Sequence, residues 1–100
     1  MGRVKRRRLR WEPSADVEKY RLYWSTQGPV GYESDFVELD NRTQAILPDE
    51  IPSFPRIAEN FELGITAVNT VGNESDITIA RAFFDFTVPE APKGIIVEDM

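Results

Sequence analysis

Residues 61–69 read FELGITAVN and carry the longest strict alternation in the chain. Apolar residues recur at every second position from Phe61 to Ala67, and Gly72-Asn73 follows as a turn signal. Alternate side chains of a β-strand lie on the same face of its sheet. This stretch therefore predicts a strand with one buried face.

Five shorter runs of the same kind flank this stretch, and turn-forming residues such as Gly28-Pro29 separate them. We interpret Asp40-Asn41, between the third and fourth runs, as a tight hairpin turn. Six predicted strands without an intervening helix indicate an all-β fold, a two-sheet antiparallel β-sandwich or small barrel of about six to seven strands. The five runs contain Leu9 and Trp11, Tyr20 to Trp24, Phe36 to Leu39, Thr43 to Leu47, and Asp76 to Phe86.

The connection at residues 48–60 contains three prolines and has no clean period. Proline cannot donate a hydrogen bond to a strand ladder, so we expect this segment to cross between the sheets. It would lay Ile51, Phe54 or Ile57 over an open end of the core.

Composition limits the classes of function. The chain has 100 residues, of which 41% are hydrophobic and 29% charged, which is the balance of one globular domain. It has no cysteine and no histidine, so disulfides, thiolate metal sites and imidazole catalysis are excluded. No apolar run is long enough to cross a bilayer, and no apolar stretch follows the N-terminal charges as in a signal peptide. We expect no enzyme, cofactor, metal or membrane partner.

The first ten positions hold half of the 12 basic residues and form a basic arm, residues 1–8, that runs into the first strand. The other positions hold 6 basic and 17 acidic residues. Strand alternation places Arg6, Arg8 and Arg10 on an outer face, where acidic side chains can pair with them. The alternative is contact with nucleic acid or another polyanion, because clustered cations release counterions on binding. Its candidate residues are Lys5, Arg6, Arg7, Arg8 and Arg10.

From about Leu9 to Phe86 the sequence resembles a fibronectin type III module. Trp11 before a proline is similar to that family's second-strand tryptophan, and the run from Tyr20 to Trp24 is similar to its third strand. Residues 61–69 with Gly72 and Ser75 are similar to its sixth strand and the following turn. The resemblance implies an immunoglobulin-like sandwich acting as a non-catalytic protein-interaction or spacer module. It also implies a larger multi-module parent of extracellular or cell-surface location.

Two departures from the family matter. Phe61 stands where the family usually has a tyrosine, which removes one hydroxyl hydrogen bond. Only ten residues precede Trp11, which is too few for the family's first strand and turn, and residues 89–97, PEAPKGIIV, are similar to the start of such a module. We therefore divide the chain into a sandwich at residues 1–88 and a linker or strand-like tail at residues 89–100.

Three explanations of the tail remain open. It begins a following module, it adds as a strand beside Leu9 to Trp11 of a neighbouring copy, or it is disordered while the basic arm supplies a short edge strand. The family's chain ends lie at opposite poles, so we do not expect the tail to complete its own domain. Ile95 and Val97 are the tail's candidate contacts.

Other aromatic residues divide between core and surface. The even spacing of Trp11, Tyr20 and Trp24 favours a core position over a carbohydrate-binding face. Tyr23 and Tyr32 are candidates for exposed protein contacts.

A second candidate patch comes from the last strand. If Ile77, Ile79 and Phe83 face inward there, Phe84 and Phe86 face outward and form an apolar contact patch. The alternative is that the tail or the long connection folds over these two rings.

Overall fold

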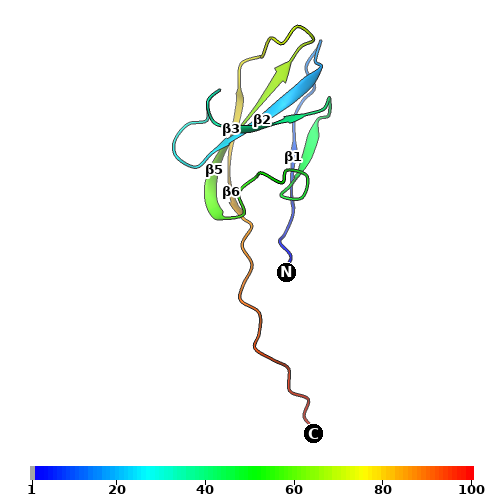
Figure 1. The fold of residues 1–100 in the computed structure, drawn as a ribbon, viewed down its shortest axis with the longest axis vertical. Helices are drawn as coiled ribbons and strands as arrows, with labels where there is room; N and C mark the ends of the chain where they lie inside the picture. Colours follow the sequence, from blue (N-terminus) through cyan, green and yellow to red (C-terminus); the bar gives the residue numbers. More distant parts are fainter. Residues whose placement is uncertain (1) are drawn as a thin grey trace.

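The computed structural model describes residues 2–100, which form two antiparallel sheets (Figure 1). The small sheet pairs β1 (Arg7–Arg10) with β4 (Gln44–Leu47). The large sheet has the order β3 (Asp35–Leu39), β2 (Lys19–Ser25), β5 (Ala58–Val68), β6 (Thr78–Asp85). These six strands overlap the six predicted runs, and the all-β antiparallel prediction is confirmed.

Strand β5 organises the large sheet. With 11 residues it is the longest strand among those described, and it pairs with β2 on one side and with β6 on the other. Phe61 and Leu63 are buried in the core, as the alternation predicts, whereas Ile65 and Ala67 on the same face are only half-buried. The inner face of β5 is therefore covered at one end and open at the other.

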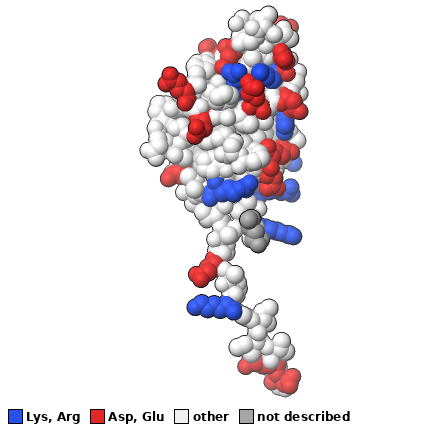
Figure 2. All heavy atoms as spheres, in the orientation of Figure 1, with Lys and Arg blue, Asp and Glu red and all other residues white. Residues whose placement is uncertain are grey.

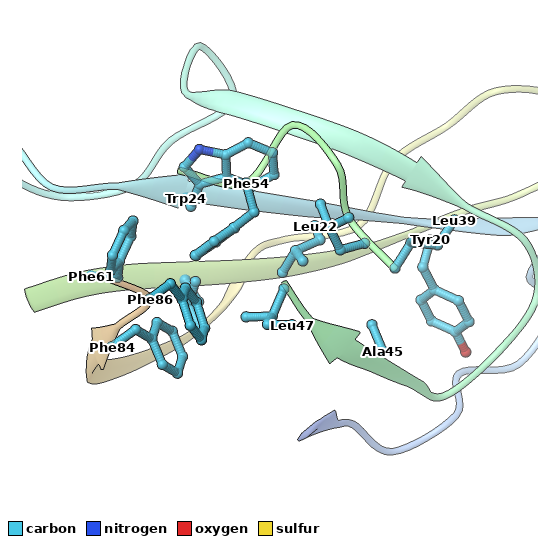
Figure 3. Close-up of a cluster of buried hydrophobic side chains, with 12 residues drawn as sticks. Tyr20, Leu22, Trp24, Leu39, Ala45, Leu47, Phe54, Phe61, Phe84 and Phe86 are labelled. Atoms are coloured by element: carbon cyan, nitrogen blue, oxygen red, sulfur yellow. The ribbon is translucent and has the colours of Figure 1, made fainter. Parts of the chain in front are cut away.

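The two sheets face each other across one hydrophobic core (Figure 3). Phe54, from the connection between β4 and β5, lies among the rings of four other aromatic residues, with centroid distances of 4.8 to 6.0 Å. Ile51 is buried beside it, whereas Ile57 is exposed. The prediction that this connection covers an end of the core is confirmed. The core residues are Tyr20, Leu22, Trp24, Leu39, Ala45, Leu47, Ile51, Phe54, Phe61, Leu63, Phe84 and Phe86.

The predicted hairpin at Asp40-Asn41 is wrong. Strands β3 and β4 belong to different sheets, so residues 40–43 carry the chain from one sheet to the other. Leu39 and Ala45, which flank this connection, are both buried in the core between the sheets. Turn residues show that the chain changes direction, but they do not choose which strands pair.

The predicted orientation of β6 is also wrong. Phe84 and Phe86 are 1% and 3% exposed and lie in the core, whereas Phe83 is 54% exposed. Ala82 lies opposite Phe61 in the register. The inner face of β6 therefore combines small alanines with two phenylalanines. The exposed patch predicted at Phe84 and Phe86 does not exist.

The segment before β1 and the segment after β6 lie at the same end of the body. Gly2 lies so close to Val88 that a Cβ on Gly2 would come within 2.9 Å of the valine side chain. Strand β1 thus begins beside the point where the chain leaves β6. From there residues 89–100 extend away from the body (Figure 1), and the molecule measures 70 Å along its longest axis against 26 and 18 Å along the others.

The position of Phe54 makes it a test of the core. Replacing Phe54 with alanine removes a buried ring that packs against Trp24, Phe61, Phe84 and Phe86, and should lower the free energy of unfolding by about 3–5 kcal/mol. The matched change Phe83→Ala removes the same group from an exposed site and should cost about 1 kcal/mol or less. Urea denaturation followed by circular dichroism measures both, and equal losses would contradict the described orientation of β6.

Candidate functional site

A groove of about 690 Å³ opens between the two sheets on the β1 side. Leu9 and Trp11 line it from the β1 segment, Ile65 and Ala67 from β5, and Ala80 from β6. It exists because the small sheet, with two strands, faces a sheet of four. Its floor is the half-buried end of β5, so the groove is largely apolar.

One edge of β1 has no strand partner among the described residues, since β1 pairs only with β4. The amide of Trp11 donates to the carbonyl of Thr43 at 3.0 Å, which continues the ladder between β1 and β4. In an antiparallel ladder, alternate residues direct their backbone groups to opposite edges. Arg8 and Arg10 therefore direct their N–H and C=O groups to the open edge. Such an edge is a template for another strand.

Trp11 stands at the rim of this groove and not in the centre of the core. It is half-buried, and its ring meets the ring of Tyr20 edge-on at 5.7 Å. Its indole N–H is buried and has no hydrogen-bond partner among residues 2–100. A buried donor without a partner costs free energy. Tyr20 and Trp24 are fully in the core, as predicted.

The basic arm makes few ion pairs with the acidic body. Arg6 lies 3.9 Å from Asp49, and both side chains are exposed. Arg7 lies over the ring of Phe84 at 5.0 Å and donates to the carbonyl of Phe83 at 3.2 Å. The described part of the chain contains no ion pair of Lys5, Arg8 or Arg10, and these three side chains are exposed.

Of the two tyrosines predicted to be exposed, only Tyr32 is. Tyr32 is 53% exposed, and its hydroxyl donates to the carbonyl of Ser75 at 2.8 Å. Tyr23 is 1% exposed, so the prediction for it is wrong. It does point outward from the large sheet, but the rings of Tyr32 and Phe36 cover it at 6.2 and 5.2 Å. The tyrosine is thus buried by residues outside its own strand.

The hydroxyl of Tyr23 belongs to a polar cluster around Glu74. It donates to one carboxylate oxygen of Glu74, to which Thr66 also donates at 2.5 Å, and Arg21 pairs with the other oxygen at 2.9 Å. Burial raises the pKa of Tyr23, and so does its hydrogen bond to Glu74. Burial alone would raise the pKa of Glu74, but these hydrogen bonds and the charge of Arg21 outweigh it and lower that pKa. The carboxylate is fully engaged, so its role is to hold residues 73–75 against β2.

The exposed apolar residues of the large sheet lie on the same outer face. They are Phe36 on β3 and Ile79 and Phe83 on β6, with an ion pair of 2.9 Å between Arg81 and Glu62 among them. Sequence reasoning placed Ile79 and Phe83 inside. The missed signal was the pair Ala80 and Ala82, whose small side chains fit opposite the large residues of β5.

Comparison with known protein families, with curated proteins and with solved structures finds no match to this chain. Among residues 2–100 no group of three acidic, cysteine or histidine side chains is placed to hold a metal ion. The same residues contain no helix that could cross a membrane.

The Glu74 cluster predicts a dependence of stability on pH. The pKa of Glu74 is lower in the folded chain than its ordinary value of 4.5, so its contribution is present above that value and is lost as the pH falls through the folded pKa. Glu74→Gln keeps the shape but loses the charge, and should cost about 1–3 kcal/mol at neutral pH. Below pH 4.5 the variant and the wild type should converge.

Urea denaturation at a series of pH values measures this effect. Glu33→Gln, a change of the same kind at an exposed turn, is the control and should leave the profile unchanged. A constant difference between Glu74→Gln and the wild type across the acid range would show that the ionised carboxylate is not the stabilising species.

Proposed function

We propose that this chain is a fibronectin type III-like module whose β1 edge is unpaired among residues 2–100, and that it serves as a non-catalytic protein-interaction or spacer module. Two features support the family assignment. Strands β3, β2, β5 and β6 form one sheet opposite the small sheet, and Trp11 follows β1, at the place that the family gives to its second-strand tryptophan. The strand missing from the resemblance is the one that would lie on the open edge of β1.

The observation that carries the proposal is the unpaired β1 edge beside an apolar groove. An extended polypeptide that adds to this edge gains main-chain hydrogen bonds from Arg8 and Arg10, and every second side chain enters the groove. Binding of this kind requires no catalytic group and no cofactor. The ligand class is therefore an extended, alternately apolar segment of protein.

A second candidate function is polyanion binding through the basic arm. The observation that favours it is that Lys5, Arg8 and Arg10 are exposed without ion pairs among the described residues. Such binding would be weakened strongly by salt, because it depends on counterion release. It would not involve the groove.

These two functions are separated by titrating the isotope-labelled chain, under conditions in which it is monomeric, with two probes. A peptide of alternating threonine and valine should shift the backbone amide resonances of Arg8 and Arg10 and the indole resonance of Trp11. A peptide with proline at every second position is the matched control and should shift none of them, because it cannot complete a ladder.

Single-stranded DNA is the second probe. If polyanion binding is the function, DNA should shift resonances throughout residues 3–10, and its affinity should fall steeply between about 50 and 200 mM salt. If the alternating peptide at millimolar concentration leaves the amide resonances of Arg8 and Arg10 and the indole resonance of Trp11 unchanged, strand binding at β1 is contradicted.

A further inference from the structure

We infer that the groove beside β1 takes the tail of a second copy of this chain, which adds as an antiparallel strand and builds a head-to-tail assembly. This inference rests on the proposed function, because it names the occupant of the same edge. The inserted segment is residues 94–99, GIIVED.

The tail carries an apolar segment that nothing in its own chain covers. Ile95 and Val97 are 93% and 90% exposed, and Ile96 between them is also exposed. All three are β-branched residues that favour strands. An exposed run of this kind usually marks a contact with another molecule. The described structure thus contains an uncovered groove and an unpaired strand-forming segment in one chain.

Charge selects the direction of the inserted strand. Glu98 and Asp99 follow the apolar run, whereas the basic residues from Lys5 to Arg8 precede and begin β1. Antiparallel addition brings the acidic end of the tail beside this basic end of β1. Parallel addition would bring the same carboxylates beside Glu12, which lines the other end of the groove. Figure 2 shows acidic side chains at the far end of the tail and basic side chains at the base of the body.

Burial and charge together select one register. When Ile95 lies opposite Trp11, Val97 lies opposite Leu9, and both side chains enter the groove. Glu98 then lies opposite Arg8 on the outer face. Asp99 lies opposite Arg7, on the same face as Ile95 and Val97.

Other registers are disfavoured. A shift of one residue in one direction would place Glu98 opposite Leu9 in the apolar groove, and in the other direction would place Gly94, which has no side chain, opposite Trp11. A shift of two residues would bring Lys93 opposite Trp11 or Asp99 opposite Leu9. The selected register is therefore the one that places apolar side chains opposite both Leu9 and Trp11.

The tail reaches a neighbour and not its own groove. It leaves the body beside the start of β1, where Val88 contacts Gly2. Folding back from this point along its own β1 would make it run parallel to that strand, in the disfavoured direction. A second copy that lies in the same orientation, farther along the direction of the tail, presents the Trp11 end of its β1 to that tail. The tail then runs antiparallel to β1 of the second copy. The acceptor's own tail then points onward, so the contact is heterologous and forms open chains or rings instead of a reciprocal dimer.

The first test is the state of assembly. Residues 89–100 are exposed throughout, so their removal takes away no buried contact of the body. Analytical ultracentrifugation of the full chain should show a series of species that grows beyond a dimer with concentration, and a chain ending at residue 88 should be monomeric. A full chain that stays monomeric at millimolar concentration, or an assembly that persists without the tail, overturns the inference.

The second test addresses the register. A synthetic peptide of residues 92–100 should bind the chain ending at residue 88 and shift the Trp11 indole resonance. Arg8→Glu should weaken this binding roughly tenfold, because an attraction becomes a repulsion. A peptide with Glu98→Arg should recover most of the loss with the Arg8→Glu variant. Arg56→Glu makes the same charge change at an exposed site outside the groove and is the control.

The outcomes separate this inference from the proposed function. If the alternating peptide shifts Arg8, Arg10 and Trp11 but the tail peptide does not, the groove binds strands and the tail is not its occupant. If neither peptide binds, both proposals fail. If Arg56→Glu lowers the affinity for the tail peptide as much as Arg8→Glu does, attraction between net charges explains the binding and the register is wrong.

Discussion

In this protein a sheet of two strands packs against a sheet of four, and this mismatch determines both where the core is closed and where a groove remains. The inner face of the large sheet offers more apolar surface than β1 and β4 can bury. At one end Phe54, from the connection between β4 and β5, fills the gap with a buried ring that packs against the aromatic residues of the large sheet. At the other end nothing in the described chain covers Ile65 and Ala67 to the same degree, and the groove remains.

The open edge therefore combines the features that a strand-binding site needs. The backbone groups of Arg8 and Arg10 are directed outward, the floor is apolar, and the indole N–H of Trp11 lacks an acceptor. Each feature alone is ordinary in a small β protein. Together they favour an extended segment over a compact ligand, because only a strand satisfies the backbone edge and the groove at once.

The outer face of the large sheet is organised differently. There the ionised carboxylate of Glu74 joins β2, β5 and the turn after β5 through Tyr23, Thr66 and Arg21. This cluster holds the face rigid beneath Tyr32 and Phe36. The exposed rings of Phe36 and Phe83 thus stand on a fixed surface, separate from the groove.

The strands themselves were predictable from the sequence, because a period of two is a local property. The strand at residues 61–69 needed no knowledge of the fold, whereas the sequence did not distinguish the buried Ile51 and Phe54 from the exposed Ile57, or the exposed Tyr32 from the buried Tyr23. The sequence did not show which face of β6 is buried. Ile79 and Phe83 lie on one face, and Ala80, Ala82 and Phe84 lie on the other, so both faces carry apolar residues.

Only the tertiary structure decided the relations between distant segments. It buried Tyr23 beneath Tyr32 and Phe36, separated β3 from β4, and placed Gly2 beside Val88. The physical reason is that burial depends on what packs against a residue from elsewhere in the chain. The sequence by itself determined where strands form. The packing of the two sheets determined that the open edge of β1 borders a groove, and that the tail leaves from the wrong end to fill it.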